Sequence, residues 1–164
     1  MRQIIILLLL AGLLGNLPTA ATAATVPDAV SLPELVAASD HILIVRVTKV
    51  DMVNRWGFKV RHQSAMTGPG RGRIIRLHLV VDEVITSTAT EVPPKIVLSL
   101  EPEFHYSLGQ IQDAHSDTND QFIVLLKGPD FVAPYFGVFS QPLQSKDEVL
   151  RLRKGHVGET PHQN

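Results

Sequence analysis

The sequence predicts a mainly β protein: a small OB-like β-barrel of five or six strands, with a short helix before it and another helix after it. Several short segments are rich in Ile, Val and Leu and alternate apolar with polar side chains, as half-buried strands do. Proline and glycine lie between these segments, where turns are expected. Two further segments have helical spacing, and each begins with a capping-box pattern.

Residues 1–24 have the pattern of a secretory signal peptide. Arg2 gives a positive start, residues 4–14 form an apolar run, and Ala21-Thr22-Ala23 offers a cleavage site. The run is shorter than the roughly 20 apolar residues that cross a bilayer. We therefore expect an exported protein, periplasmic or extracellular, without a membrane span after cleavage. An uncleaved anchor is the alternative.

Residues 25–154 are expected to form a single domain, because a chain of this length can enclose one core without staples. Residues 155–164 have little to bury and predict a flexible tail. The chain has no cysteine, so it forms no disulfide. Its 15 Lys and Arg residues nearly balance 16 Asp and Glu residues, which argues against nucleic acid as a partner. We expect a monomer.

Capping boxes predict the two helices. Ser31-Leu32-Pro33-Glu34 begins a helix that continues to about Ser39, with Leu35 and Val36 on its apolar face. Ser145-Lys146-Asp147-Glu148 begins a second helix, which Gly155 is placed to end. We expect this terminal helix to pack on the barrel.

Two long strands are predicted first. Residues 41–50 are apolar on both faces as far as Val45 and alternate afterwards, which indicates a strand that is covered on both sides at its start. Residues 74–85 alternate until the parity slips at Val84. A β-bulge near Asp82 and Glu83 would restore the alternation and bend the strand, as closing a barrel requires.

Shorter strands are predicted at residues 96–100 and 122–126. The first is bounded by prolines on both sides, and the second is apolar on both faces. Residues 135–139 predict the last strand, after a turn at residues 128–130. A weaker strand is predicted at residues 58–62.

Read in order, the segments HILIVRVTKV, LHLVVDEVITST, PPKIVLSL and DQFIVLLKG resemble a group of exported bacterial proteins. Their chain is similar to the netrin-like OB-fold barrels of the tissue inhibitors of metalloproteinases. The resemblance covers about residues 31–140 and implies a five-stranded barrel. Those inhibitors act through an N-terminal cysteine, which this chain lacks, so no inhibitory residue is carried over.

The stretch from residue 55 to residue 78 is basic and contains no acid. Its cationic residues are Arg55, Lys59, Arg61, Arg71, Arg73 and Arg76. Its glycines let backbone N–H groups approach an anion, and Arg71 and Arg73 can bind carboxylate, sulfate or phosphate. Trp56 beside them favours a contact surface, and Tyr106 marks a second candidate loop. The alternative is a hairpin loop that its charge keeps solvated.

Residues 101–120 have the opposite sign, with five acidic residues and no Lys or Arg. Asp113, His115 and Asp117 alternate as oxygen ligands do at the start of a calcium loop, which makes them metal candidates. Thr118 stands where the turn glycine belongs and Val124 where the bidentate glutamate belongs, so an exposed polar loop is the other reading. The segment is also placed to face the basic loop within the fold.

The sequence favours a binding or interaction module over an enzyme. It contains no nucleophile elbow and no phosphate loop, and its histidines lack metal-site spacing. We expect no cofactor, and we expect an anionic ligand or a protein as partner. A calcium- or zinc-dependent secreted protein or hydrolase built on residues 113–120 is the alternative, and a structural envelope component is a third possibility.

Overall fold

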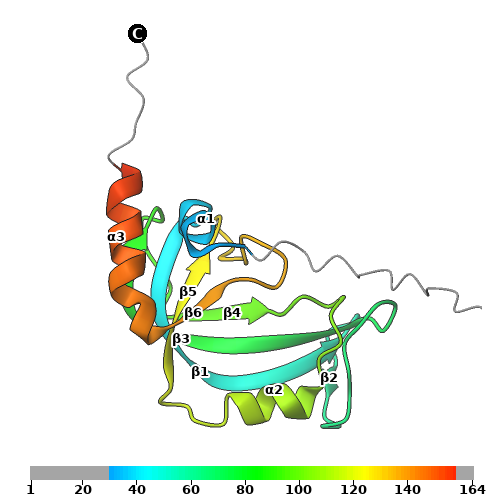
Figure 1. The fold of residues 1–164 in the computed structure, drawn as a ribbon. Helices are drawn as coiled ribbons and strands as arrows, with labels where there is room; N and C mark the ends of the chain where they lie inside the picture. The colour runs from blue at the N-terminus through cyan, green and yellow to red at the C-terminus, as the bar shows by residue number, and fades with distance from the viewer. Residues whose placement is uncertain (1–29, 158–164) are drawn as a thin grey trace, which may run out of the picture.

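The computed structural model describes residues 30–157 and confirms a mainly β fold (Figure 1). The predicted signal peptide lies outside the described residues, and so does the tail from residue 158. The elements are α1 (Leu32–Ala37), β1 (His41–Asn54), β2 (Lys59–Val60), β3 (Arg73–Ser87), β4 (Lys95–Ser99), α2 (Leu108–Ala114), β5 (Gln121–Leu126), β6 (Ser140–Pro142), the 3-10 turn η1 (Leu143–Ser145) and α3 (Lys146–Val157). None of the helices within this range is long and apolar enough to span a bilayer.

The strands form one antiparallel sheet in the order β4-β3-β1-β5-β6, with the short β2 paired to the end of β1. The sheet is open, because β4 and β6 are its two edges and do not pair with each other. The predicted barrel is therefore not confirmed. β6 has only three residues, which pair with residues 122–124 of β5, and its other edge pairs with no strand of the described chain.

The predicted β-bulge is confirmed at Asp82. Ile44 lies opposite Glu83 and Val45 opposite Val81, so Asp82 is the additional residue on β3. Two further irregularities in the same pair leave Ile85 of β3 and Thr48 of β1 without a partner. Each additional residue reverses the side-chain parity and bends the strand, which explains the broken alternation in the sequence.

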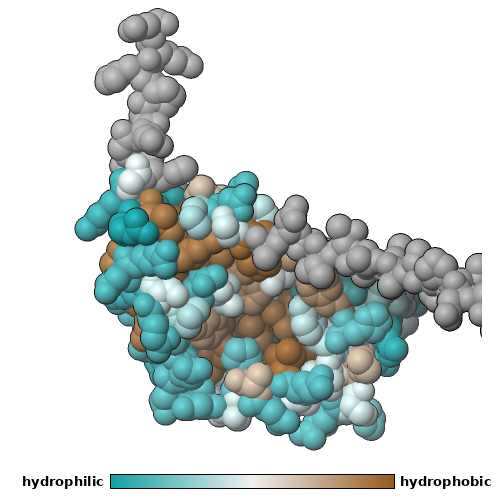
Figure 2. Space-filling model, viewed as in Figure 1, coloured by the Kyte–Doolittle hydropathy of each residue, from teal (hydrophilic) through white to brown (hydrophobic). Residues whose placement is uncertain are grey.

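Two hydrophobic clusters cover the two faces of the sheet. The larger one lies on the inner face, where β1, β3, β4 and β5 pack against Leu108 of α2 and the loop around Ala65. The smaller one lies on the outer face, where Ile44 and Ile123 pack against α1 and Val149 of α3. The first residues of β1 are therefore buried on both sides, as predicted. Figure 2 shows hydrophobic residues gathered in the middle of the viewed face, over the strands, and hydrophilic residues around its margin.

Two predictions about the C-terminal half are wrong. Residues 135–139 do not form the last strand, because only a Tyr135–Val138 bridge joins two of them across a turn and β6 follows afterwards. Gly155 does not end the last helix but lies inside α3, so residues 155–157 of the predicted tail are helical. Helix α2 at residues 108–114 was not predicted, and only its last two residues fall in the stretch 113–120 that was read as a polar loop. The weak strand at residues 58–62 is confirmed only as the two-residue β2.

Candidate functional site

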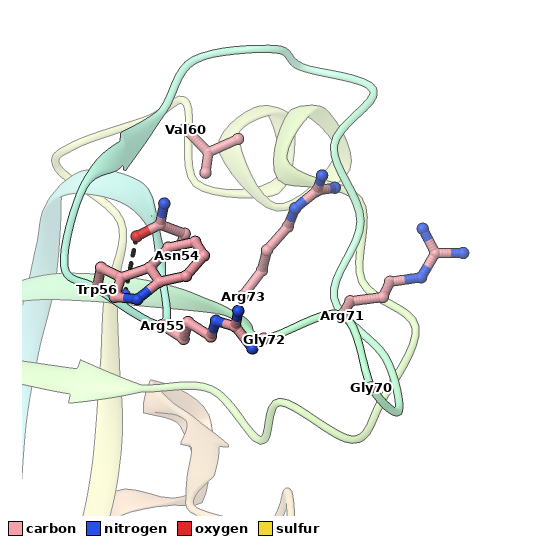
Figure 3. Close-up of a pocket in the computed structure, with 8 residues that line it drawn as sticks. All are labelled: Asn54, Arg55, Trp56, Val60, Gly70, Arg71, Gly72 and Arg73. Carbon is pink, nitrogen blue, oxygen red and sulfur yellow. Dashed lines mark hydrogen bonds between the residues drawn. The ribbon is translucent and has the colours of Figure 1, made fainter.

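A pocket of about 380 Å³ lies where β1 ends and β3 begins. Asn54 and Arg73 are paired across these two strands and point to the same face as Met52 and Ile75 of the core. The pocket is therefore an opening at the end of the inner face. Its lining residues are Asn54, Arg55, Trp56, Val60, Gly70, Arg71, Gly72 and Arg73 (Figure 3).

A tight turn after β1 holds Trp56 at the rim of the pocket. The side-chain Oδ1 of Asn54 accepts hydrogen bonds from the backbone N–H groups of Trp56 and Phe58, each at 3.0 Å. Gly57 completes the turn with φ of +82°, a conformation that glycine adopts without strain. The indole of Trp56 is 66% exposed although its backbone is fixed. The chain thus presents a large aromatic surface on a rigid support.

The glycine-rich loop forms the opposite wall. The backbone N–H of Arg71 donates to the carbonyl of Gly68 at 3.1 Å, which closes a turn. Gly72 has φ of +58°, a left-handed conformation that favours glycine. This turn brings the loop beside Arg55, so residues 55 and 72 line the same pocket.

Positive charge dominates the pocket. The guanidinium carbon of Arg55 lies 4.1 Å from the centre of the Trp56 ring in a cation–π contact. Figure 3 shows Arg73 extending toward Val60 across the pocket, whereas Arg71 points away from the other side chains. Within residues 30–157, no carboxylate forms an ion pair with Arg55, Arg71 or Arg73. Arg55 and Arg73 therefore line the pocket, with Arg71 at its outer rim, and no acid compensates their charge within the described residues.

Arg76 and Tyr106 do not belong to this pocket. Arg76 lies on the outer face of the sheet, where its Nε and Nη2 donate to the two carboxylate oxygens of Asp51 at 2.8 and 3.0 Å. Tyr106 packs against the inner core, and burial together with the charge of Glu101 raises the pKa of its phenol. The predicted set thus divides into Trp56, Arg71 and Arg73 at the pocket and two residues elsewhere.

The acidic segment, residues 101–120, contacts the start of the glycine-rich loop at residues 67 and 68 but does not neutralise the charge of that loop. The backbone N–H of Gly68 donates to the carbonyl of Pro102 at 2.8 Å, and that of Thr67 donates to the carbonyl of Tyr106 at 2.9 Å. These bonds lie between backbone groups. Among the ion pairs of the described chain, none joins the two segments.

The metal candidates are spread along α2 and the turn that follows it. Asp113 lies in α2, His115 is its C-cap, and Asp117 accepts a hydrogen bond from the backbone N–H of Asn119. Burial lowers the pKa of His115, whose ring lies against Phe122. In the part of the chain that the structure describes, no three His, Asp or Glu side chains converge as metal ligands would.

Comparison with known proteins does not indicate a function for this pocket. No protein-family model matches this chain, and no curated protein matches it. The netrin-like resemblance stays a prediction that rests on the hydrophobic pattern, and the residues that line the pocket carry the functional argument.

Sequence reasoning missed part of the pocket wall. Asn54 was not singled out, and Arg55 was placed only within the general basic stretch. An available signal was the run Asn54-Arg55-Trp56-Gly57 directly after a long strand, because asparagine and glycine in this order favour a turn that asparagine supports with its side chain. Such a turn fixes the direction of Trp56.

Proposed function

We propose that the protein is an exported binding module that takes an anionic ligand into the pocket between the Asn54 turn and the glycine-rich loop. The observation that carries the proposal is the meeting of Arg55, Arg73 and Trp56 at one pocket without a carboxylate partner. Export rests on the signal-peptide pattern of residues 1–24.

Guanidinium groups favour ligands that carry carboxylate, sulfate or phosphate. They donate several hydrogen bonds in a fixed planar geometry, and a bond to a charged oxygen is stronger than one between neutral groups. Trp56 and Val60 add apolar surface beside these donors. The best-fitting ligand is therefore an anion with a flat or apolar part next to its charge, such as an aromatic carboxylate.

Binding without turnover fits the lining residues. Arginine, asparagine, tryptophan, valine and glycine supply donors and contact surface, but none of them is a base or nucleophile of the usual kinds. The pocket is open to solvent, and its positive field attracts anions at the surface. We therefore expect affinity that decreases with ionic strength.

The fluorescence of Trp56 offers a direct test, since it is the only tryptophan of the chain. We expect titration with benzoate, phosphate or citrate to change the emission of the full-length protein. Arg73→Gln should weaken the binding about tenfold, the effect of losing one charge-assisted hydrogen bond. Arg61→Gln is the matched control, because it removes the same charge from an exposed residue outside the pocket lining.

If Arg73→Gln and Arg61→Gln gave equal emission changes and equal affinities, the proposal would be contradicted, because only net charge would then matter. No response to any of the three anions at about 10 mM would contradict it as well. Arg71→Gln ranks the two loop arginines, and its effect should be smaller because the side chain points away from the pocket.

A further inference from the structure

We propose that the free edge of β4 binds a positively charged peptide in extended conformation, which adds to the sheet as a further strand. This surface is separate from the basic pocket, since none of its residues lines that pocket. The proposal rests on the backbone groups of the edge, on an exposed aromatic groove beside it, and on the charge of that groove.

Two backbone hydrogen bonds show which way the peptide groups of β4 point. The N–H of Leu100 donates to the carbonyl of Ile75 at 2.9 Å, and the N–H of Val81 donates to the carbonyl of Pro94 at 3.0 Å. Because bonded pairs alternate along an antiparallel ladder, every second residue between these points turns its peptide group away from β3. These residues are Lys95, Val97 and Ser99.

No other strand of the described chain pairs with this edge. The unpaired donors and acceptors of three alternate residues repeat at the spacing of an extended chain, which is the template that an added strand requires. Val97, in the middle of this edge, is 52% exposed.

A groove of about 290 Å³ continues from the end of this edge. Ser99 and Glu101 line one side of it, and residues 132–137 and 139 of the segment that leads into β6 line the other. Eight large hydrophobic residues are exposed in the described chain, and five of them lie on or next to this edge and groove. They are Val97, Phe104, Val132, Tyr135 and Phe136.

The aromatic side chains of the groove are held in place. Phe104 meets Phe136 edge to face with ring centres 4.8 Å apart, although Phe136 is 58% exposed. Gly137 lies directly under the Phe104 ring with φ of +72°, where any Cβ would collide with the ring. A rigid apolar surface loses little conformational entropy when a partner covers it, so it favours binding.

The charge of the groove indicates the kind of peptide. Glu101 lines the groove and Glu103 follows it by two residues in the chain, and neither forms an ion pair within residues 30–157. Residues 131–142, which include the other wall, contain no charged side chain. A peptide that alternates lysine or arginine with apolar residues would place its apolar side chains in the groove and its charges beside these carboxylates.

The test uses a fluorescently labelled peptide of about eight residues that alternates lysine with valine and phenylalanine. We expect it to bind the full-length protein in fluorescence anisotropy. Val97→Pro should weaken binding about tenfold, because it removes an outward N–H without breaking a bond to β3. Phe58→Ala is the matched control: it removes an exposed aromatic side chain that lines neither the basic pocket nor the groove, and it should leave peptide affinity unchanged.

Hydrogen exchange of the unmutated protein gives a second measurement that does not depend on the folding of a variant. The peptide should slow exchange of the Val97 and Ser99 amides, which face outward, more than that of the Leu98 amide, which already bonds to β3. The same peptide with alternate backbone nitrogens methylated should bind at least about tenfold more weakly.

Three results would overturn the proposal: no binding at about 1 mM peptide, equal affinity of the methylated peptide, or protection of the Val97 amide in a dimer of the free protein. The last would show that a second copy occupies the edge. Failure of the anion titration at Trp56 would leave this proposal intact, since the two surfaces share no residue.

Discussion

Asp51 is the most strongly perturbed acid of the described chain. Its carboxylate is nearly buried on the outer face of the sheet, with 8% of the residue exposed. Burial acts to raise its pKa, but hydrogen bonds from Arg76, Lys49 and His78 together outweigh burial and hold the pKa well below its usual range. The folded state therefore favours the charged form of Asp51.

The linkage between this pKa and folding predicts a pH-dependent effect of Asp51→Asn. A carboxyl group whose pKa is lower in the folded state stabilises the fold above its unfolded pKa of about 4 and loses that effect as the pH falls further. We expect the variant to lose about 1–3 kcal/mol of unfolding free energy at pH 7, because Arg76 loses its bidentate partner. The difference from the unmutated protein should shrink steadily below pH 4.

Urea denaturation at pH 7, 4 and 3 measures this dependence. Asp82→Asn is the matched control, because Asp82 forms a similar bidentate pair with Arg46 at an exposed position. Its effect should be smaller, since solvent screens an exposed pair. An equal loss in the two variants, or a difference for Asp51→Asn that does not change with pH, would show that the Asp51 cluster adds no special stability.

Helix α1 depends on its capping box, which the structure confirms. The backbone N–H of Ser31 donates to Glu34 Oε2 at 2.9 Å, and the backbone N–H of Glu34 donates to Ser31 Oγ at 3.4 Å. The helix has only six residues, and its buried Leu35 and Val36 cover the outer face of the sheet. A short helix has few other sources of stability, so its first turn matters.

We expect Ser31→Ala to destabilise the protein by about 1 kcal/mol and to lower its melting temperature by a few degrees, because an N–H group at the helix start loses its acceptor. Ser31→Thr keeps a hydroxyl that can both accept from the Glu34 N–H and donate to the Glu34 carboxylate, and it should restore most of the loss. Differential scanning calorimetry of the unmutated protein and the two variants measures the difference. Equal melting temperatures for Ser31→Ala and Ser31→Thr would show that the cap is not the cause.

Alternation of side chains located the four main strands, because a sheet with one covered face selects that pattern. It could not locate α2, since Leu108 and Ile111 are the only apolar pair at helical spacing in a polar stretch. It also mistook residues 135–139 for a strand, because their apolar side chains line a groove and form no ladder.

Some of the residues that line the pocket could be named from the sequence. Composition identified Trp56, Arg71 and Arg73, because a basic glycine-rich loop is visible in the sequence. The predicted set also included Arg76. The alternation in β3 indicates that this side chain points away from the core, but the sequence does not show that it pairs with Asp51. Only the three-dimensional pairing of β1 with β3 brings this carboxylate to Arg76 and leaves Arg73 without an acid.

At the scale of the whole molecule, export predicts a shortened protein. Mass spectrometry of the protein recovered outside the cytoplasm should show that about 24 residues are missing from the N-terminus. Ala23→Phe should block this cleavage, because the signal peptidase site requires small residues. Recovery of the full-length chain from the cytoplasm alone would contradict export without affecting either binding proposal.

The central position of β1 also determines when the chain can fold. One of its partners, β5, is distant in sequence: Ile44 pairs with Ile123, and both belong to the same buried cluster. Closing so long a loop costs entropy before its contacts form, which makes such topologies slow to fold. While the ribosome is still producing the middle of the chain, β1 lacks this neighbour. The ladder between β1 and β5 therefore cannot form before residue 126 has been synthesised, so the buried cluster on the outer face of the sheet is completed only late in the production of the chain.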